Sequence, residues 1–452
     1  MKLAMAVPRD KEVTLGSMRV MRVLEVIDCC RAYASLVSSI TLNPGAISFM
    51  VTKTHQVDSV VAHSASPKVS DARREDASAS KERLEIGGHV PALDGVRGLA
   101  IVMVLVVHFI GDTQPGTFFE EALTQVTSYG AMGVDLFFVL SGFLITGILF
   151  DSRKKSAYFK NFYMRRVLRI FPLYYAVLLL ALVGIPQIVH IEELNKAVEH
   201  QAWLWTYSAN IFVALKGSFE ALPVFSHFWS LAVEEQFYLV WPLVVFFCDG
   251  PRLKRVSLIV AAGALVLRFS MILAGVNDVA VYALTPGRLD GLAMGALLSI
   301  VVRDDPRTYR LARIANLTFV ISATFIVLSF VLTRWVPGAR PSLHEIRQTA
   351  FAGCFCSILL YSMSGPRFVR RFFQSRTMTF FGKYSYGLYV FHFLYCYFLL
   401  RYRTEYVVAR LVGSHTLAIF IQAAVGIGVA VLISLISYNL FEKHFLKLKS
   451  KF

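Results

Sequence analysis

Apolar runs recur along the chain after residue 90, and they are long enough to cross the roughly 30 Å hydrocarbon core of a bilayer, which takes about 20 helical residues. They can be placed near residues 93–111, 130–150, 171–189, 228–248, 257–274, 288–302, 314–333, 346–363, 384–401 and 416–441. Because lipid offers the backbone no hydrogen bonds, such runs must cross it as helices. We therefore expect an all-α fold, a polytopic integral membrane helical bundle with about ten transmembrane helices.

The composition excludes an ordinary soluble chain. Of the 452 residues, 56% are hydrophobic and 13% are aromatic, and both shares exceed the usage of soluble globular domains. The formal net charge of +16 would also suit a nucleic-acid-binding protein. The positions of the basic residues decide between these explanations.

Lysine and arginine gather in alternate loops. The basic segments lie at 153–169, 252–255, 303–313, 367–376 and 443–451, whereas the loops 112–129 and 275–287 have neither residue. The late outer loops follow this separation less closely, since they contain Arg334, Arg340, Arg403 and Arg410. The positive-inside bias predicts that the basic loops and both termini are cytoplasmic. The basic excess is thus chiefly a topology signal, and no nucleic-acid partner is expected.

The chain divides into three parts. Residues 1–90 contain charge clusters such as DARREDASASKERLE and no continuous strongly apolar run, which predicts a cytoplasmic, largely disordered extension. This segment lacks the order of regions found in a signal peptide. Residues 91–446 form the expected membrane domain, and 447–452 form a basic cytoplasmic tail. The six cysteines include no CxxC pair, so we expect neither a disulfide framework nor a bound metal.

The first apolar run, PALDGVRGLAIVMVLVVHFI, contains three ionisable residues, each of which costs free energy in a bilayer. A helix turns about 100° and rises 1.5 Å per residue, so Arg97 and His108 share a face and lie about 16 Å apart along the axis. Asp94 lies on the same face, one turn before Arg97. The alternative to a functional stripe is that the first polar residues cap the helix and that His108 is a structural histidine. Three ionisable groups in one stripe favour a stripe that faces the bundle interior or a watery cavity.

Two further segments place polar side chains at the ends of spans. Arg166 and Arg169 precede the third run on one helix face, and on the residues alone they could equally anchor the span. Glu234 and Glu235 enter the fourth run from the outer side, with Ser230 one turn before Glu234. Because a carboxylate is costly to expose to lipid, at least one should point into the bundle. It would belong there either to a site or to a polar pair that joins helices.

Weaker candidates lie further along the chain. Asp290 follows Arg288 by two residues at the start of the sixth run, and His392 lies inside the ninth. Each could serve a site or merely satisfy a neighbouring helix, and His392 also fits a structural histidine.

Six motifs follow one another in a fixed order. The first is LDGVRG followed by an apolar run, with arginine and histidine placed as R-x10-H. The others are GVDLFFVLSGFLIT, YMRRVLRIFPLYY, HFWSLAVEEQFYLVWPL, GRLDGLAMGALLS and KYSYGLYVFHFL. This ordered set resembles the acyltransferase family 3 proteins, the membrane O-acyltransferases that modify bacterial polysaccharides, lipooligosaccharides and peptidoglycan. The resemblance covers roughly residues 90–446. It departs from the family at His444, where EKHF replaces the usual EKPF, and in the long leading extension.

The resemblance implies a multi-pass enzyme of the bacterial inner membrane. It would move an acyl group, acetyl by default, from cytoplasmic acyl-CoA to a hydroxyl group of an extracytoplasmic or membrane-linked glycan. His108 would be the general base, since imidazole titrates near neutral pH, although an acyl-carrying role stays open. Arg97, oriented by Asp94, would bind the anionic end of CoA, and the R-x-x-R pair Arg166 and Arg169 would contact its phosphates or ribose. No hydrolase-like domain follows the last span, so we expect a stand-alone membrane enzyme.

The acceptor side and the competing classes are less defined. Ser230, Glu234, Glu235, Asp290 and His392 are the candidate acceptor or auxiliary residues. A polytopic transporter or flippase for a glycan or lipid-linked substrate is the main alternative, since about ten spans with buried charge also describe a carrier. A scaffold without catalysis would not need His108 aligned with Arg97. Thioester-dependent release of CoA would separate the enzyme from both.

Overall fold

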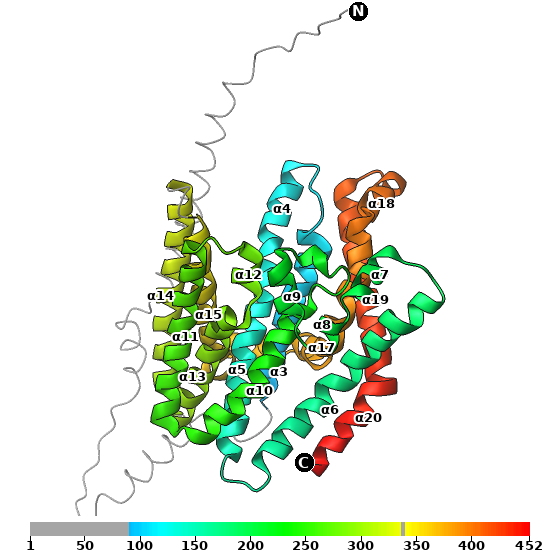
Figure 1. Ribbon diagram of the computed structural model, residues 1–452. Coiled ribbons are helices and arrows are strands. Elements are labelled where there is room, and N and C mark those ends of the chain that lie inside the picture. The colour runs from blue at the N-terminus through cyan, green and yellow to red at the C-terminus, as the bar shows by residue number, and fades with distance from the viewer. Residues whose placement is uncertain (1–89, 336–339) are drawn as a thin grey trace, which may run out of the picture. The chain divides into compact units, whose positions relative to one another are not determined.

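Each apolar run of the sequence coincides with a long helix in the computed structural model, which describes residues 90–335 and 340–452 (Figure 1). The predicted extension over residues 1–90 therefore lies, apart from Val90, outside the described residues. The ten long helices in the described part of the chain are α3 (Pro91–Val106), α5 (Gly133–Ser152), α6 (Tyr158–Leu178), α10 (Phe228–Phe247), α11 (Gly250–Leu273), α13 (Thr285–Asp304), α14 (Thr308–Trp335), α15 (Arg340–Ser364), α17 (Arg376–Arg401) and α19 (His415–Ser437). No β-strand occurs within the described ranges, so the all-α prediction is confirmed there.

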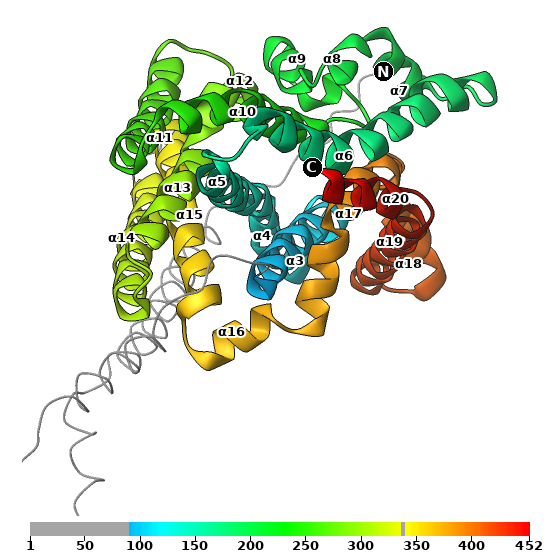
Figure 2. The same cartoon turned by 90° about the horizontal axis from the view of Figure 1, so that it is seen from below.

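Shorter helices connect these ten. On the side of the bundle where the loops 112–129 and 275–287 lie, they include α4 (Phe118–Ser128), α7 (Glu192–Glu199), α8 (Ala202–Trp205), α9 (Ala209–Lys216) and α12 (Asp278–Ala283), together with α18 (Thr404–Val412). On the other side lie α16 (Arg367–Phe373) and α20 (Lys443–Lys447), both of which are labelled in the view from below (Figure 2). The described residues also form short turns of 3₁₀ or π type: η1 (Val107–Gly111), η2 (Tyr129–Met132), η3 (Leu179–Gly184), η4 (Ile185–Gln187), η5 (Phe219–Ala221), η7 (Tyr438–Glu442) and η8 (Leu448–Lys451).

Seven helical stretches of the described chain are long and apolar enough to cross a membrane. They are Pro91–Gly111, Phe118–Ser152, Tyr158–Gln187, Phe228–Phe247, Gly250–Leu273, Tyr309–Leu332 and His415–Lys451. The helices α13, α15 and α17 are long but are not among them. Charged residues explain part of this difference, since α13 contains Arg288 and Asp290 and α17 contains Lys383. The chain is thus a multi-pass helical protein with seven candidate spans, and the count of about ten spans stays a prediction.

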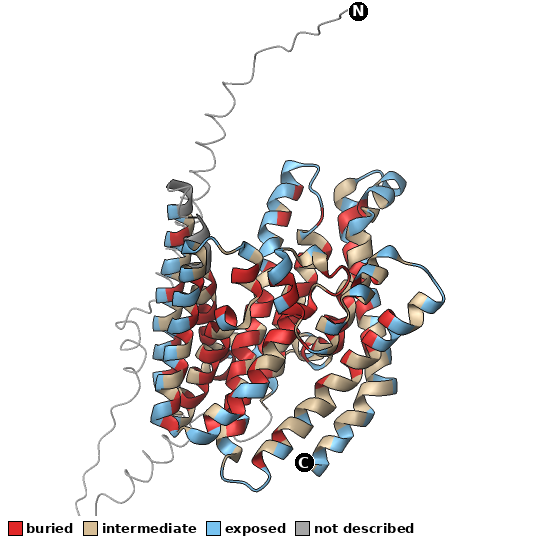
Figure 3. Cartoon of the chain, viewed as in Figure 1, coloured by how far each residue is buried: buried red, intermediate tan, exposed pale blue. Residues whose placement is uncertain are grey.

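Burial separates central helices from peripheral ones (Figure 3). In the stretch that contains α5, 72% of the apolar window is buried, against 17% in the stretch within α14. The exposed face of α14 presents large apolar side chains such as Leu317, Val320 and Phe325. An apolar outer face on a multi-pass protein is the surface expected to contact lipid.

The helix α3 lies against α17 and α5 in the centre of the bundle (Figure 2). Glycine makes this close contact possible, because a side chain on Gly98 would collide with the backbone carbonyl of Met378 at the start of α17. In the same way, a side chain on Gly382 would collide with the carbonyl of Asp94. Gly98 and Gly382 therefore allow the start of α3, which contains Asp94 and Arg97, to lie beside the first turns of α17.

Candidate active site

An interior cavity of about 140 Å³ lies among α3, α5, α6, α10 and α17. Its polar lining consists of Arg97, Ser141, Arg166, Arg169, Ser230, Glu234, Glu235, Tyr238, Ser385, Tyr386 and Tyr389, and its apolar lining includes Phe137, Leu144 and Ile148. We call this space the inner cavity. It brings together six of the residues that the sequence singled out, from three helices that are far apart along the chain.

Glu234 anchors a chain of hydrogen bonds in the inner cavity. The Ser141 hydroxyl donates to Oε1 of Glu234 at 2.5 Å, and the Tyr238 hydroxyl donates to Ser141 at 3.0 Å. Neither Ser141 nor Tyr238 was a sequence candidate, although both lie in the quoted motifs. Their signal was a hydroxyl group inside an otherwise apolar segment that must find a polar partner.

Glu235 and Arg166 keep polar atoms available in the same space. Oε1 of Glu235 and Nε of Arg166 are buried and have no hydrogen-bond partner among the described residues. The Arg166 guanidinium lies 6.0 Å from the ring centres of both Phe162 and Tyr238. A carboxylate and a guanidinium with unused hydrogen-bonding capacity are suited to hold a polar ligand, because leaving them unpaired in a buried site is costly.

At one end of α3, Nη1 of Arg97 lies 2.5 Å from Oδ1 of Asp94, with both side chains about three-quarters buried. This end also borders a second, wider cavity of about 600 Å³. Arg97, Arg169 and Tyr386 line both cavities. The two spaces therefore share a wall, and the arginines stand where they meet.

At the other end of α3, His108 lies in the π-turn η1, where the backbone N–H of Asp112 donates to the carbonyl of Val107 at 2.9 Å. Such π-turns inside helices frequently occur at functional sites. Nδ1 of His108 is 2.8 Å from the carbonyl oxygen of Val104 and 3.3 Å from Nε2 of His392. His108 is thus paired with a residue that sequence reasoning ranked as a weak candidate.

His392 is completely buried, and its Nδ1 lies 2.8 Å from the carbonyl of Tyr389 and 3.1 Å from that of Leu388. Since a carbonyl oxygen can only accept, Nδ1 of His392 must donate the proton, which leaves its Nε2 as an acceptor. By the same argument Nδ1 of His108 carries a proton, which it donates toward the carbonyl oxygen of Val104 and Nε2 of His392. Nε2 of His108 is then the nitrogen that can accept a proton.

A third histidine, His227, completes this cluster and was not a sequence candidate. Its ring centre is 5.3 Å from that of His392, and its Nε2 lies 3.3 Å from the carbonyl of Val390. Its signal was its position just before the fourth apolar run, as the first residue of the motif HFWSLAVEEQFYLVWPL. Within the described ranges, no group of three or more His, Cys, Asp or Glu side chains is arranged to hold a metal ion.

Tyr389 and Ser230 separate the inner cavity from the histidines. Both line the cavity, and none of the three histidines is among the described residues that do. The two hydroxyl oxygens are 2.5 Å apart, and the Tyr389 hydroxyl donates to the carbonyl of His227 at 2.9 Å. The Tyr389 ring centre is 5.5 Å from that of His392. We call this pair the partition, since the inner cavity lies on one side of it and the histidines on the other.

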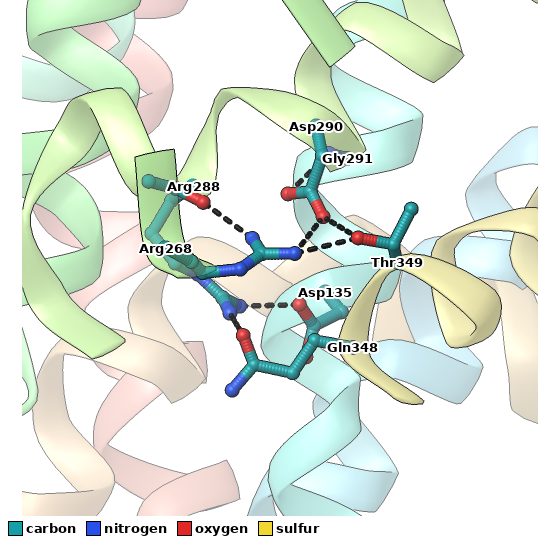
Figure 4. A network of polar contacts seen from close by, with 8 residues as sticks. Asp135, Arg268, Arg288, Asp290, Gly291, Gln348 and Thr349 are labelled. Carbon is teal, nitrogen blue, oxygen red and sulfur yellow. Dashed lines mark hydrogen bonds and ion pairs between the residues drawn. The ribbon is translucent and has the colours of Figure 1, made fainter. Parts of the chain in front are cut away.

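Asp290 lies in a different place, a buried network that joins α5, α11, α13 and α15 (Figure 4). Nη2 of Arg268 is 2.9 Å from Oδ2 of Asp290, which also accepts from Thr349 at 2.7 Å. Arg288 pairs with Asp135. Neither acid nor either arginine is among the residues that line the inner cavity. Within each pair the positive charge of the arginine balances the negative charge of the carboxylate. Such pairing is the condition for burying charged side chains in the interior.

The segments that form this site lie within the part of the chain that matches known proteins. Residues 90–439 match a family described as Acyltransferase domain (Acyl_transf_3). The chain is 30% identical over 320 residues to the peptidoglycan O-acetyltransferase OatA of Listeria monocytogenes, covering 68% of this chain and 49% of that protein. It is 28% identical over 340 residues to the O-acetyltransferase OatA of Staphylococcus aureus, covering 69% and 51% respectively. The chain spans about half the length of the curated relatives it matches. No solved structure matches it.

Proposed function

Because this chain belongs to the acyltransferase 3 family, we propose that it is a membrane O-acyltransferase that transfers an acyl group from acyl-CoA to a hydroxyl group of a glycan. Acetyl is the first candidate for the acyl group, because the matched relatives are named O-acetyltransferases. The name of the Listeria relative likewise makes a peptidoglycan-like glycan the first candidate acceptor.

The observation that carries the proposal is the inner cavity, which runs from a cluster of arginines toward a histidine. Arg97, Arg166 and Arg169 lie together along it, and guanidinium groups suit phosphate recognition. Beyond the partition lies His108, whose Nε2 is its proton-accepting nitrogen. A donor with an anionic head and a long thin arm fits this order of groups. Its head would lie at the arginines and its thioester near Tyr389.

The reaction needs one base, and it needs the thioester and the acceptor hydroxyl to meet across the partition. Nε2 of His108 takes the proton from the acceptor hydroxyl as the oxygen attacks the thioester carbonyl carbon. The new C–O bond forms, the C–S bond breaks, and the sulfur of CoA leaves with the electron pair. The imidazolium returns its proton to that sulfur, so that CoA departs as the thiol and His108 is neutral again. Atoms and charge balance without a metal or redox partner.

Glu234 and Glu235 have a different part in this proposal. Glu234 is already bonded to Ser141, so it helps fix the shape of the inner cavity. The unpartnered oxygen of Glu235 is the better candidate to accept a hydrogen bond from the amide groups of a pantetheine arm or from a sugar hydroxyl. Ser230 acts through the partition, since it holds the Tyr389 hydroxyl.

The proposed location is the bacterial inner membrane, with the basic loops and both termini in the cytoplasm. This orientation rests on the positive-inside bias. It puts the arginine end of α3 on the side where acyl-CoA is made and His108 near the opposite side, where a surface glycan would be met.

The decisive experiment is the release of CoA from acetyl-CoA by membranes that contain the protein and a glycan acceptor. His108→Ala should abolish it without changing the amount of protein in the membrane. His190→Ala is the matched control, because His190 is exposed and its side chain bonds only to Asn195 among the described contacts. Full activity of the His108→Ala protein would contradict the mechanism. CoA release by membranes with the wild-type protein that is no greater than that by membranes without it would instead favour the transporter or flippase alternative.

A further inference from the structure

The wider cavity has the size and position of an entrance to the inner cavity. Its volume is about 600 Å³, compared with about 140 Å³ for the inner cavity, and it shares Arg97, Arg169 and Tyr386 with it. Asp94 of α3, the first turns of α17, the turn η7 and the helix α20 supply the rest of its wall. We call this space the basic vestibule. A wide chamber joined to a narrow one suits a ligand with a bulky head and a thin arm.

The charge of the basic vestibule favours an anion. Its lining contains four cationic side chains, Arg97, Arg169, Arg376 and Lys383, and two anionic ones, Asp94 and Glu442, an excess of two positive charges. Asp94 is already paired with Arg97, and Glu442 accepts a hydrogen bond from Ser437 at 3.0 Å. The two acids are therefore engaged within the protein. Arg376 and Lys383 are exposed, and the guanidinium of Arg376 has no ion pair with any described residue.

Aromatic rings lie beside these cations. Nζ of Lys383 is 5.1 Å from the ring centres of both Tyr384 and Tyr438. Those two rings meet edge to face at 5.0 Å, and Phe380 is 5.0 Å from Tyr384. Tyr438 and Phe380 also line the vestibule. Basic side chains next to aromatic faces are suited to a nucleotide, because the rings can stack on a base while the cations meet its phosphates.

We propose that the basic vestibule binds the nucleotide end of the CoA donor, the 3′-phosphorylated adenosine diphosphate, and that Arg376 and Lys383 contact its phosphates. This inference rests on the proposed function, because it takes the donor to be a CoA thioester. It adds a site on α17 and η7 to the arginines of α3 and α6. The pantetheine arm then passes Arg97, Arg169 and Tyr386 into the inner cavity.

The competing explanation is that these cations contact lipid headgroups, which also carry phosphate. Basic residues at the cytoplasmic end of a span commonly do so. The two sources differ in what they require. A nucleotide site distinguishes CoA from dephospho-CoA and from pantetheine, whereas a headgroup site depends on anionic lipid and is indifferent to the nucleotide.

The test is direct binding to the full chain in nanodiscs of zwitterionic lipid. The probes are CoA, dephospho-CoA and pantetheine, and the proteins are wild type, Arg376→Gln, Lys383→Gln and Arg371→Gln. Arg371 is the matched control, because it is an exposed arginine of the neighbouring helix α16 that does not line the vestibule. We expect Arg376→Gln and Lys383→Gln each to weaken CoA binding about tenfold, the effect of one charge-assisted contact. They should leave pantetheine binding unchanged and narrow the difference between CoA and dephospho-CoA.

Each outcome decides the question. If wild-type protein does not bind CoA, the proposed function and this inference are both overturned. If it binds CoA and the two α17 variants bind it equally well, only this inference is overturned. The same holds if pantetheine binding falls as much as CoA binding, or if Arg371→Gln matches the α17 variants. Finally, if the two α17 variants equal the wild type in zwitterionic nanodiscs and differ from it only when the nanodiscs contain anionic lipid, the vestibule is a headgroup site.

Discussion

Nδ1 of His108 and Nε2 of His392 lie 3.3 Å apart, although 284 positions separate these residues in the sequence. The contact has a direction, because the carbonyl groups of Leu388 and Tyr389 fix the proton of His392 on the far nitrogen. His392 can then only accept from His108. It thereby helps to hold the proton of His108 on Nδ1 and to keep Nε2 free for an acceptor hydroxyl.

The first prediction is that His392 acts as a positioning residue for His108. His392→Leu removes the acceptor and should lower kcat about tenfold, the value of one hydrogen bond to the base, with little change in KM for acetyl-CoA. His392→Gln should restore much of kcat, because its amide can donate to the carbonyl of Tyr389 and still accept from His108. Steady-state kinetics of both variants check this. Equal losses in the leucine and glutamine variants would reduce His392 to a packing role.

The partition gives the second prediction. Tyr389→Ala removes the ring between the inner cavity and the histidines, so water from the acceptor side should reach the thioester. We expect the ratio of acetyl-CoA hydrolysis to acetyl transfer to rise about tenfold or more, since this variant loses the exclusion of water that closed sites rely on. Tyr389→Phe keeps the ring and should keep the ratio low. The two products, free acetate and acetylated acceptor, can be counted with labelled acetyl-CoA, and a low ratio in Tyr389→Ala would refute the barrier.

The third prediction concerns stability. Arg288 is fully buried and pairs with Asp135 on another helix, so Arg288→Ala leaves a buried carboxylate without this cation. We expect a loss of about 3–5 kcal/mol in the free energy of unfolding. Replacing both partners at once, as in Arg288→Met with Asp135→Leu, should recover most of that loss because no uncompensated charge remains.

Denaturation in mixed micelles measures these free energies, with an exposed pair as the control. Arg252 lies 3.8 Å from Asp249, and its side chain is 68% exposed. Arg252→Ala should therefore change stability by less than about 1 kcal/mol. A double variant at Asp135 and Arg288 that is no more stable than Arg288→Ala alone would show that the network contributes more than charge balance.

The buried network also marks the limit of what the sequence could predict. The apolar runs located every long helix among the residues that the structure describes, since hydrophobic length depends on local composition alone. The pairing of Asp135 with Arg288 depends instead on which faces of α5 and α13 meet, and no single segment contains that information. The signal was nevertheless present: Asp135 and Arg268 each interrupt an apolar run, and an isolated charge there implies an opposite partner. Two charged residues of the network also affect the count of spans, because Arg288 and Asp290 keep α13 below the apolar content of a typical span.

The candidate site was predicted more fully. Arg97, Arg166, Arg169, Ser230, Glu234 and Glu235 were all found in segments of a recognisable order, and they line one cavity. Ser141, Tyr238, His227 and Tyr389 were missed, because a hydroxyl or imidazole in an apolar segment does not by itself tell which neighbour it meets. Their roles follow only from distances between helices.

The last prediction tests sidedness, on which the path from the arginines to His108 depends. Gln114 is exposed in the loop before α4, and Ser156 is exposed in the basic loop between α5 and α6. After the native cysteines are replaced, Gln114→Cys should react with a membrane-impermeant thiol reagent outside intact cells, and Ser156→Cys should react only once the membrane is opened. Gln114 is preferable to Thr117, whose hydroxyl accepts from the backbone of Glu120 and caps α4. The reverse labelling pattern would turn the protein over in the membrane. Arg97 and the basic vestibule would then face outward, where no cytoplasmic acyl-CoA could reach them, and the donor would have to enter from the side of His108.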